Sequence, residues 1–382
     1  MKSLIVIMMN ESVPFLHQHQ QDVLDAFQAK DGRTNMLQRV RVEHGNITNL
    51  YLNRTNLADV PVETWTLRHL SRLWLSDNCI STLPSPTSTE EASGLEWLWM
   101  CNNRLVHVPS VVFQHLTSLT QLWLNGNPLI ATIPAGISAL TNLEKLGVVN
   151  CGLRQLPPEL GCLLRLDKLD AYGNYLTDIP DALGDLENLT YLALNSNRLT
   201  TLTSSIGRLT SLRWLSLNSN LLETLPESIG DLVNLERLSL HMNLLTSIPI
   251  ALGRCSNLLA LSLFKNQLTS LHVGMCAGLH KCTTFSLALN GLTELPADLG
   301  RMTSIELLWL QSNRISKVPR GSFGRMPNLQ RLWIDNNLFR NVPRDLSLCT
   351  RLVDLVVDDD MDSAWVKELM PEVRVGTVAH TG

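Results

Sequence analysis

An eleven-residue pattern, L-x-x-L-x-L-x-x-N-x-L, recurs in register over most of this chain and constrains its fold more than any other feature. Residues 212–222 give one copy, Leu-Arg-Trp-Leu-Ser-Leu-Asn-Ser-Asn-Leu-Leu. Successive copies lie 23 to 25 residues apart, and a period of this length is typical of solenoids, in which each repeat forms one coil. The first position of the pattern is occupied by Ile47, Leu70, Leu95, Leu119, Leu143, Leu166, Leu189, Leu212, Leu235, Leu258, Cys282, Ile305, Leu329 and Leu352.

Over residues 47–360 this consensus resembles the leucine-rich repeat family. The run from Leu225 to Leu232, Leu-Pro-Glu-Ser-Ile-Gly-Asp-Leu, precedes a new copy and is similar to the intracellular 23-residue class of Ras-group and scaffolding proteins. The resemblance implies an α/β fold, a right-handed solenoid or horseshoe with a parallel concave β-sheet and short helices or 3₁₀ turns on the convex side. It also implies a non-enzymatic scaffold that binds proteins in intracellular signalling.

The pattern itself predicts the same sheet. In a strand, side chains alternate between the two faces, so positions 4 and 6 point inward while positions 3, 5 and 7 point outward. Every coil runs in the same sense, which makes neighbouring strands parallel and about 4.8 Å apart. The outward positions of fourteen strands therefore form one long concave surface.

We predict three segments. Residues 1–46 form an N-terminal cap, with a helix from about Ser12 to the Lys30-Asp-Gly stop and a strand over residues 37–42 that pairs near Leu50. Residues 47–360 hold about fourteen repeats. Residues 361–382 form a C-terminal cap with a short helix near residues 363–369, and the last six or seven residues are expected to be disordered.

Position 9 of the pattern predicts a structural asparagine ladder, because a buried amide at that turn can satisfy backbone groups of its own and the adjacent coil. Thr55, Cys151 and Asp360 replace asparagine in three repeats. A glycine such as Gly230 is expected to end each convex helix. The ladder consists of Asn78, Asn103, Asn127, Asn174, Asn197, Asn220, Asn243, Asn266, Asn290, Asn313 and Asn337.

The outward positions 3 and 5 carry seven of the nine tryptophans. These two columns hold 28 of the 382 positions, so random placement would put fewer than one tryptophan there. Exposed aromatic side chains are enriched at binding hot spots, and column 5 is small or hydroxylic between the two aromatic ends. We therefore predict that a protein or extended peptide binds along the concave face through Tyr51, Trp74, Trp97, Trp99, Trp123, Lys145, Lys168, Asp170, Tyr191, Trp214, Arg237, His241, Trp309 and Trp333.

A structural explanation of the aromatic columns stays open at this point. Trp74, Trp99 and Trp123 would stand side by side on successive strands, and cross-strand aromatic pairs stiffen a sheet. The two explanations are compatible, since stacked rings can also bind a partner.

Motifs for chemistry are sparse. His272, Cys276, His280 and Cys282 are all competent zinc ligands, yet Cys282 occupies a core position, where a small buried cysteine commonly replaces leucine. No phosphate-binding loop, no H-E-x-x-H and no G-x-S-x-G sequence is present. We expect no catalytic residue, no metal and no cofactor.

Composition bears on partners and compartment. With 31 basic and 35 acidic residues the chain lacks the charge excess that binds nucleic acid, and no stretch approaches the ~20 apolar residues that cross a bilayer. Eight scattered cysteines favour the cytoplasm, whereas sequons at Asn46, Asn53 and Asn188 favour secretion. Two alternatives to a signalling scaffold remain: a substrate-recognition subunit or effector for an enzyme in another chain, such as a ubiquitin ligase, and a secreted or surface recognition protein.

Overall fold

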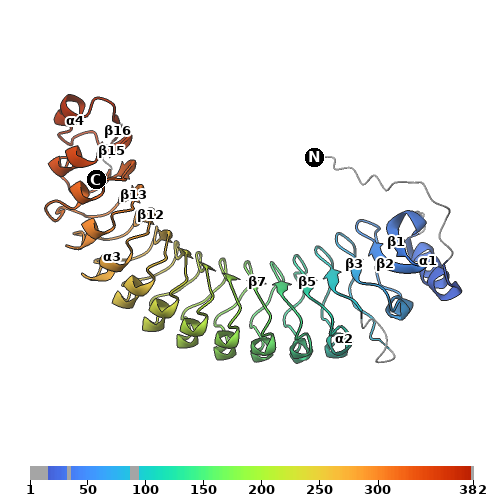
Figure 1. The fold of residues 1–382 in the computed structure, drawn as a ribbon. Helices are drawn as coiled ribbons and strands as arrows, with labels where there is room; N and C mark the ends of the chain where they lie inside the picture. The colour runs from blue at the N-terminus through green and yellow to red at the C-terminus, as the bar shows by residue number, and fades with distance from the viewer. Residues whose placement is uncertain (1–15, 32–35, 87–93, 380–382) are drawn as a thin grey trace.

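The computed structural model describes residues 16–31, 36–86 and 94–379, which form one open arc with a continuous sheet along its inner side (Figure 1). Within these ranges the sheet has sixteen strands, arranged in chain order from β1 to β16. β1 and β2 are antiparallel, and the later pairs, from β2 and β3 to β15 and β16, are parallel. Short helices stand on the outer side of the arc (Figure 1). The predicted α/β solenoid with a concave parallel sheet is confirmed.

The strands and helices are short and follow one another in strict alternation through most of the chain. The strands are β1 (Val40–Glu43), β2 (Asn46–Tyr51), β3 (Arg72–Trp74), β4 (Trp97–Trp99), β5 (Gln121–Trp123), β6 (Lys145–Gly147), β7 (Lys168–Asp170), β8 (Tyr191–Ala193), β9 (Trp214–Ser216), β10 (Arg237–Ser239), β11 (Ala260–Ser262), β12 (Thr284–Ser286), β13 (Leu307–Trp309), β14 (Arg331–Trp333), β15 (Asp354–Asp358) and β16 (Arg374–Val378). The helices are α1 (Gln18–Asp31), α2 (Ser110–His115), α3 (Met275–Gly278) and α4 (Ala364–Leu369), with 3₁₀ helices η1 (Met36–Arg39), η2 (Val62–Thr66), η3 (Ala135–Ala139), η4 (Pro158–Cys162), η5 (Asp181–Asp185), η6 (Ser204–Arg208), η7 (Glu227–Asp231), η8 (Ile250–Arg254), η9 (Leu299–Arg301), η10 (Phe323–Arg325) and η11 (Arg344–Leu348).

The core is a single column of leucines that runs the length of the arc between the sheet and the outer helices. In the eighth repeat the side chains at positions 1, 4 and 6, Leu212, Leu215 and Leu217, are fully buried. The register keeps equivalent positions in contact, so that Leu215 pairs with the leucines of β8 and β10. Full burial of one such leucine stabilises the fold by roughly 1.5–3 kcal/mol before entropy is counted. Each coil therefore depends on its neighbours for its core.

The convex glycines have a different role from the predicted one. Gly230 lies inside η7, has no positive φ, and is not a helix end. A Cβ built on it would lie 2.1 Å from the backbone oxygen of Ala251 in the next coil. The glycine is required because adjacent 3₁₀ turns approach too closely for any side chain, and the expectation of a helix-ending residue was wrong.

The N-terminal cap closes the first coil with a helix and an antiparallel strand. Val23, Leu24 and Phe27 of α1 are buried in the common core. β1 pairs with β2, with Val40 opposite Leu50. The strand starts later than predicted, because residues 36–39 form η1. The predicted helix start at Ser12 lies outside the described residues.

At the other end, α4 buries Trp365 and Val366, and β16 adds a last parallel strand beside β15. The expectation of disorder was wrong for residues 376–378, because β16 continues to Val378 and pairs with β15, whereas residues 380–382 lie outside the described residues. Asp358, rather than Asp360, takes the place of the last ladder asparagine, since its carboxylate accepts hydrogen bonds from the backbone of Asn336 and Asn337 at 2.6 and 3.5 Å.

Candidate functional site

An N-terminal aromatic cluster, made of Tyr51, Trp74, Trp97, Trp99 and Trp123, covers the concave side of β2 to β5. The register places Trp74 beside Trp99 and Trp99 beside Trp123. Tyr51 stacks on Trp74 with ring centroids 4.5 Å apart, and Trp99 meets Trp74 and Trp123 edge to face at 6.0 and 6.4 Å. All five side chains stay partly exposed. The rings therefore form a cross-strand stack and still present an aromatic surface to solvent.

Gly147 ends this cluster for a steric reason. It follows Trp123 in column 5, and a Cβ at this position would lie 2.3 Å from Cε3 of the Trp123 ring. The indole therefore leans over the next strand, which has no side chain there. The change from aromatic to small residues in column 5 therefore begins where the Trp123 ring needs space.

A polar segment follows on β6 to β8. The Lys168 ammonium lies 4.4 Å from the Tyr191 ring centroid, 5.7 Å from that of Trp123 and 3.7 Å from the Asp170 carboxylate. Asp170 is only 8 % exposed, and among the described residues its Oδ1 has no hydrogen-bond partner. Burial raises the pKa of the Asp170 carboxyl group, and the nearby Lys168 opposes that shift. Lys145 lies beside Lys168 in the sheet register and is partly exposed.

A groove of about 640 Å³ hollows the concave face from β9 to β13, between Trp214 and Trp309. It is named here the Trp214–Trp309 groove. Trp214 is the most exposed of the concave tryptophans at 39 %, and the Arg237 guanidinium lies 5.3 Å from its ring centroid. His241 approaches Ser262, with Nδ1 and Oγ 3.4 Å apart, and burial lowers the pKa of its imidazole.

The C-terminal wall of this groove is a stacked pair, Trp309 and Trp333, with centroids 5.2 Å apart. Beyond it, the Asp354 carboxylate pairs with Arg331 at 3.0 Å and with Arg374 at 2.7 Å. Asp335 is buried, and burial raises the pKa of its carboxyl group. Arg331 and Arg374 therefore share one carboxylate at this end of the concave face.

The predicted binding residues form two aromatic groups joined by the polar segment, in which Lys168 contacts Trp123 and Tyr191, and Tyr191 meets Trp214 with ring centroids 5.5 Å apart. Four strand steps, or about 19 Å, separate Trp123 on β5 from Trp214 on β9. Sequence reasoning followed columns 3 and 5, with His241 added from column 7, and did not name Phe264, Met242 and Gln311, which also line the groove. Phe264 and Gln311 occupy column 7, whose outward direction follows from strand alternation, so the register alone could have identified them.

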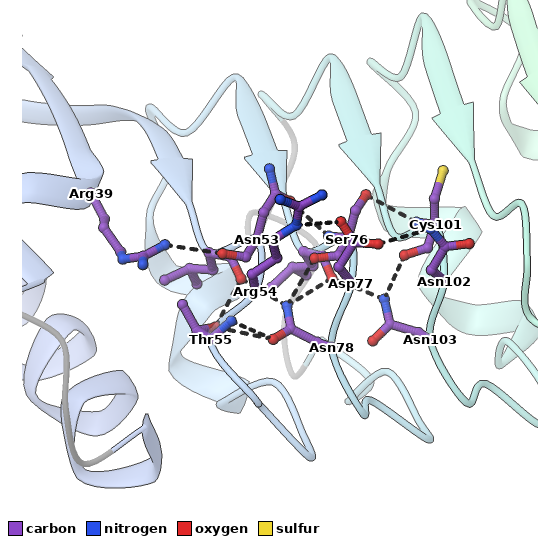
Figure 2. A network of polar contacts seen from close by, with 12 residues as sticks. Arg39, Asn53, Arg54, Thr55, Ser76, Asp77, Asn78, Cys101, Asn102 and Asn103 are labelled. Atoms are coloured by element: carbon purple, nitrogen blue, oxygen red, sulfur yellow. Dashed lines mark hydrogen bonds and ion pairs between the residues drawn. The ribbon is translucent and has the colours of Figure 1, made fainter. Parts of the chain in front are cut away.

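The asparagine ladder has the predicted hydrogen bonds. The Asn78 side chain donates to the carbonyl oxygens of Leu52 and Leu75 at 2.7 and 3.0 Å, and its Oδ1 accepts from the backbone of Thr55 and Leu57 at 2.9 and 3.1 Å. Figure 2 shows this amide between two coils, with Asn103 in the same place one coil further on. Each ladder residue therefore joins its own coil to the preceding one.

A second polar row lies next to the ladder at its N-terminal end (Figure 2). Arg54 pairs with Asp77 at 3.1 Å, and Asn102 donates to the same carboxylate at 2.8 Å. These bonds lower the pKa of the Asp77 carboxyl group, with the Asn102 bond as the largest cause. Arg39 donates to the carbonyl oxygens of Tyr51 and Asn53, which closes the first coil.

A further asparagine series was missed by the sequence analysis. These residues precede position 1 of their repeats, and each donates through Nδ2 to a backbone oxygen of the preceding coil at 2.7 to 3.2 Å. The series is Asn142, Asn188, Asn234, Asn257 and Asn328. A second amide column at a fixed offset from the first is a signal that the sequence does contain.

The four candidate zinc ligands do not come together. His272 and His280 are exposed, whereas Cys276 and Cys282 are fully buried in the core. Burial raises the pKa of the Cys282 thiol to about 12, and that of Cys276 is raised as well. Within the described ranges no group of three or more His, Cys, Asp or Glu side chains is arranged to hold a metal ion.

Comparison with known proteins supports the repeat assignment. A family model described as "Leucine rich repeat" matches residues 93–153, 164–222 and 187–245. Keratocan of Gallus gallus is 30% identical over 111 residues, which are 28% of this chain and 30% of keratocan. Prolargin of Bos taurus is 37% identical over 97 residues, 25% of this chain and 24% of prolargin. The matches thus span less than a third of either relative.

Solved structures match over more of the chain. A leucine-rich repeat protein of Leptospira interrogans is 27% identical with a TM-score of 0.58, over 86% of this chain and 95% of that one. The ectodomain of the receptor kinase GASSHO1/SCHENGEN3 of Arabidopsis thaliana, in complex with CASPARIAN STRIP INTEGRITY FACTOR 2, is 27% identical with a TM-score of 0.54, over 87% and 47%. An internalin of Listeria monocytogenes, 18% identical over 96% and 97% with a TM-score of 0.64, shares the fold.

Together, the repeat consensus, the sixteen-stranded open sheet and these matches show that the chain folds as a leucine-rich repeat solenoid. Among the described residues no helix is both long and apolar enough to span a membrane.

Proposed function

We propose that this protein is a non-enzymatic interaction protein whose concave face binds a protein or an extended peptide, in intracellular signalling. The supporting observation is the Trp214–Trp309 groove, in which aromatic, cationic and hydroxyl side chains converge on one hollow of the sheet. Buried aromatic anchors next to adaptable polar groups are the usual composition of a binding hot spot. The ectodomain in the solved complex, at 27% identity, is likewise in complex with another molecule, CASPARIAN STRIP INTEGRITY FACTOR 2.

The tryptophans at the two ends of the groove provide the test. Trp214 and Trp309 are outward-facing and partly exposed, so their truncation removes contact surface while leaving the leucine core intact. We expect the Trp214→Ala/Trp309→Ala variant to lose partners that wild-type protein retains from a lysate of its source cells, measured by quantitative mass spectrometry. Circular dichroism must show the same thermal midpoint for both proteins.

Tyr175 offers a matched control. Its ring is 50 % exposed, it stacks with Arg198 on the flank of the solenoid, and it lies outside the concave columns. The Tyr175→Ala variant should retain the full partner set. If the concave variant also retains every partner at unchanged affinity, the proposed function is wrong.

An extracellular recognition role is the second candidate, because one structural relative is a receptor ectodomain. Of the three sequons, only Asn188 is exposed; Asn46 and Asn53 are partly buried, and Asn53 accepts a hydrogen bond from the backbone of Ser76. The eight free cysteines favour an intracellular location. Expression in the native cell followed by glycosidase treatment decides between them: a mass shift that disappears in Asn188→Gln supports secretion, and an unshifted cytosolic protein supports the proposal.

A further inference from the structure

The Trp214–Trp309 groove has one charged anchor whose surroundings leave it open to a ligand. Arg237 is exposed on β10, and it forms no ion pair with any described residue. Its neighbours in the sheet register on the far side from Trp214 are Ala260 and then Thr284, which are too short to cover it. The Trp214 ring holds the guanidinium from one side only, which reduces the entropy lost when it binds an anion.

The adjoining charge does not cancel this cation. Glu236 precedes Arg237, but its carboxylate pairs with Arg213 on the rim of the sheet. His241 adds no charge near pH 7, because burial lowers the pKa of its imidazole below the ordinary range. The groove lining therefore carries a single full positive charge.

A row of serine hydroxyl groups lies between Arg237 and Trp309, which forms the opposite wall of the groove. Ser239, Ser262 and Ser286 are successive neighbours in column 5, and the next residue in the row is Trp309. Among the described residues the hydroxyls of Ser239 and Ser286 have no hydrogen-bond partner, and that of Ser262 has only the long contact to His241. These groups can donate to a carboxylate or bond to the backbone of a ligand.

We propose that this groove binds an extended peptide with a glutamate or aspartate against Arg237 and an aromatic or large aliphatic side chain four residues away, against Trp309. The inference deepens the proposed function and rests on it. Arg237 and Trp309 are three strand steps apart across the sheet, about 14 Å, and two residues apart along the strands, about 7 Å, so that about 16 Å separates their backbones. An extended chain advances about 3.3 Å per residue, so four residues span about 13 Å, and the long side chains of Arg237 and Trp309 cover the remainder. Residues i and i+4 lie on the same face. The side chain at i+2 then lies between Ser262 of β11 and Thr284 of β12.

Selection from a phage library of random dodecapeptides tests the proposal. Wild-type protein should enrich peptides with an acidic residue and an apolar residue four positions apart, in either order along the chain. Arg237→Gln should lose the acidic preference and keep the apolar one, since glutamine keeps the stem and removes the charge. The control is Arg154→Gln, which removes an exposed cation outside the concave columns and should leave the selection unchanged.

One enriched peptide, synthesised with its acidic residue changed to the neutral amide, should bind wild-type protein about ten-fold or more weakly. It should bind Arg237→Gln equally well in both forms. Moving the apolar residue to i+3 or i+5 places it on the opposite face of the extended peptide and should weaken binding similarly.

The outcomes separate this inference from the proposed function. Enriched peptides whose binding is lost with Trp309→Ala support the proposed function. If these peptides show no acidic preference, or no response to Arg237→Gln, the inference fails and the proposed function stands. Enrichment of basic peptides would also overturn it. If wild-type protein enriches no peptide that depends on the groove, the inference fails, and the proposed function is judged separately by the partner capture described above.

Discussion

The asparagine ladder makes the most quantitative prediction. Asn197 is buried, donates to the carbonyl oxygens of Ala171 and Leu194 at 3.0 Å each, and accepts from the backbone of Leu176 at 3.1 Å. Asn197→Ala leaves three backbone groups without these partners. At about 1–1.5 kcal/mol for each hydrogen bond, the unfolding free energy should fall by roughly 3–5 kcal/mol.

Urea titration followed by circular dichroism measures the loss, and hydrogen exchange locates it. Because repeats interact mainly with their neighbours, the loss should appear first as faster amide exchange in the coils on either side of Asn197. Asn195→Ala is the matched control, since this partly exposed side chain forms no hydrogen bond with the described residues. A loss below about 1 kcal/mol at Asn197, or an equal loss at Asn195, would refute the reasoning.

Three further perturbations test other parts of the structure. Asp170→Asn should stabilise the protein more at pH 7 than at pH 3. The pKa of the Asp170 carboxyl group is raised in the folded protein, so its protonated form contributes stability below the ordinary pKa of about 3.9, and this stability is lost as the pH rises. A difference in unfolding free energy that does not change with pH in chemical denaturation would contradict this. Gly147→Ala should cost roughly 1–3 kcal/mol and shift tryptophan fluorescence, because the added Cβ displaces the Trp123 ring; unchanged emission would argue against the seating of Trp123. Leu289 is exposed and has a φ of +53°, in the left-handed region. Leu289→Gly should stabilise the protein by up to about 1 kcal/mol, because the left-handed conformation costs leucine roughly 1–2 kcal/mol, which exceeds the entropic cost of glycine. A lower thermal midpoint would contradict this.

The sequence predicted the fold well where one physical requirement repeats with each coil. Leu215 and the other core leucines are periodic because every coil buries the same positions, and the ladder asparagines repeat because every coil leaves the same backbone groups to satisfy. Gly230 was misassigned because its requirement is the approach of Ala251 in the next coil, a contact that depends on three-dimensional spacing. Sequence alone could not supply that distance.

The candidate site was predicted only in part. The aromatic columns followed from register, but the groove itself depends on which side chains leave space. Phe264 was overlooked although its column 7 position follows from register, and its ring lies beside that of His241 with centroids 6.5 Å apart. The candidate zinc ligands His272, Cys276, His280 and Cys282 alternate between surface and core, and the core position of Cys282 in the repeat already argued against a metal site. Local spacing is a weak guide to ligand geometry in a coil whose residues turn away from one another.

The central claim is that the partner lies on the concave face, and hydroxyl-radical footprinting, which modifies both tryptophan and tyrosine side chains, tests it most directly. The partner captured by wild-type protein is added, and side-chain modification is compared with that of free protein. Trp214 and Trp309 should be protected in the complex, while Tyr175 on the flank should be modified equally in both states. Protection confined to Tyr175 and the convex helices, with both tryptophans unchanged, would contradict the account.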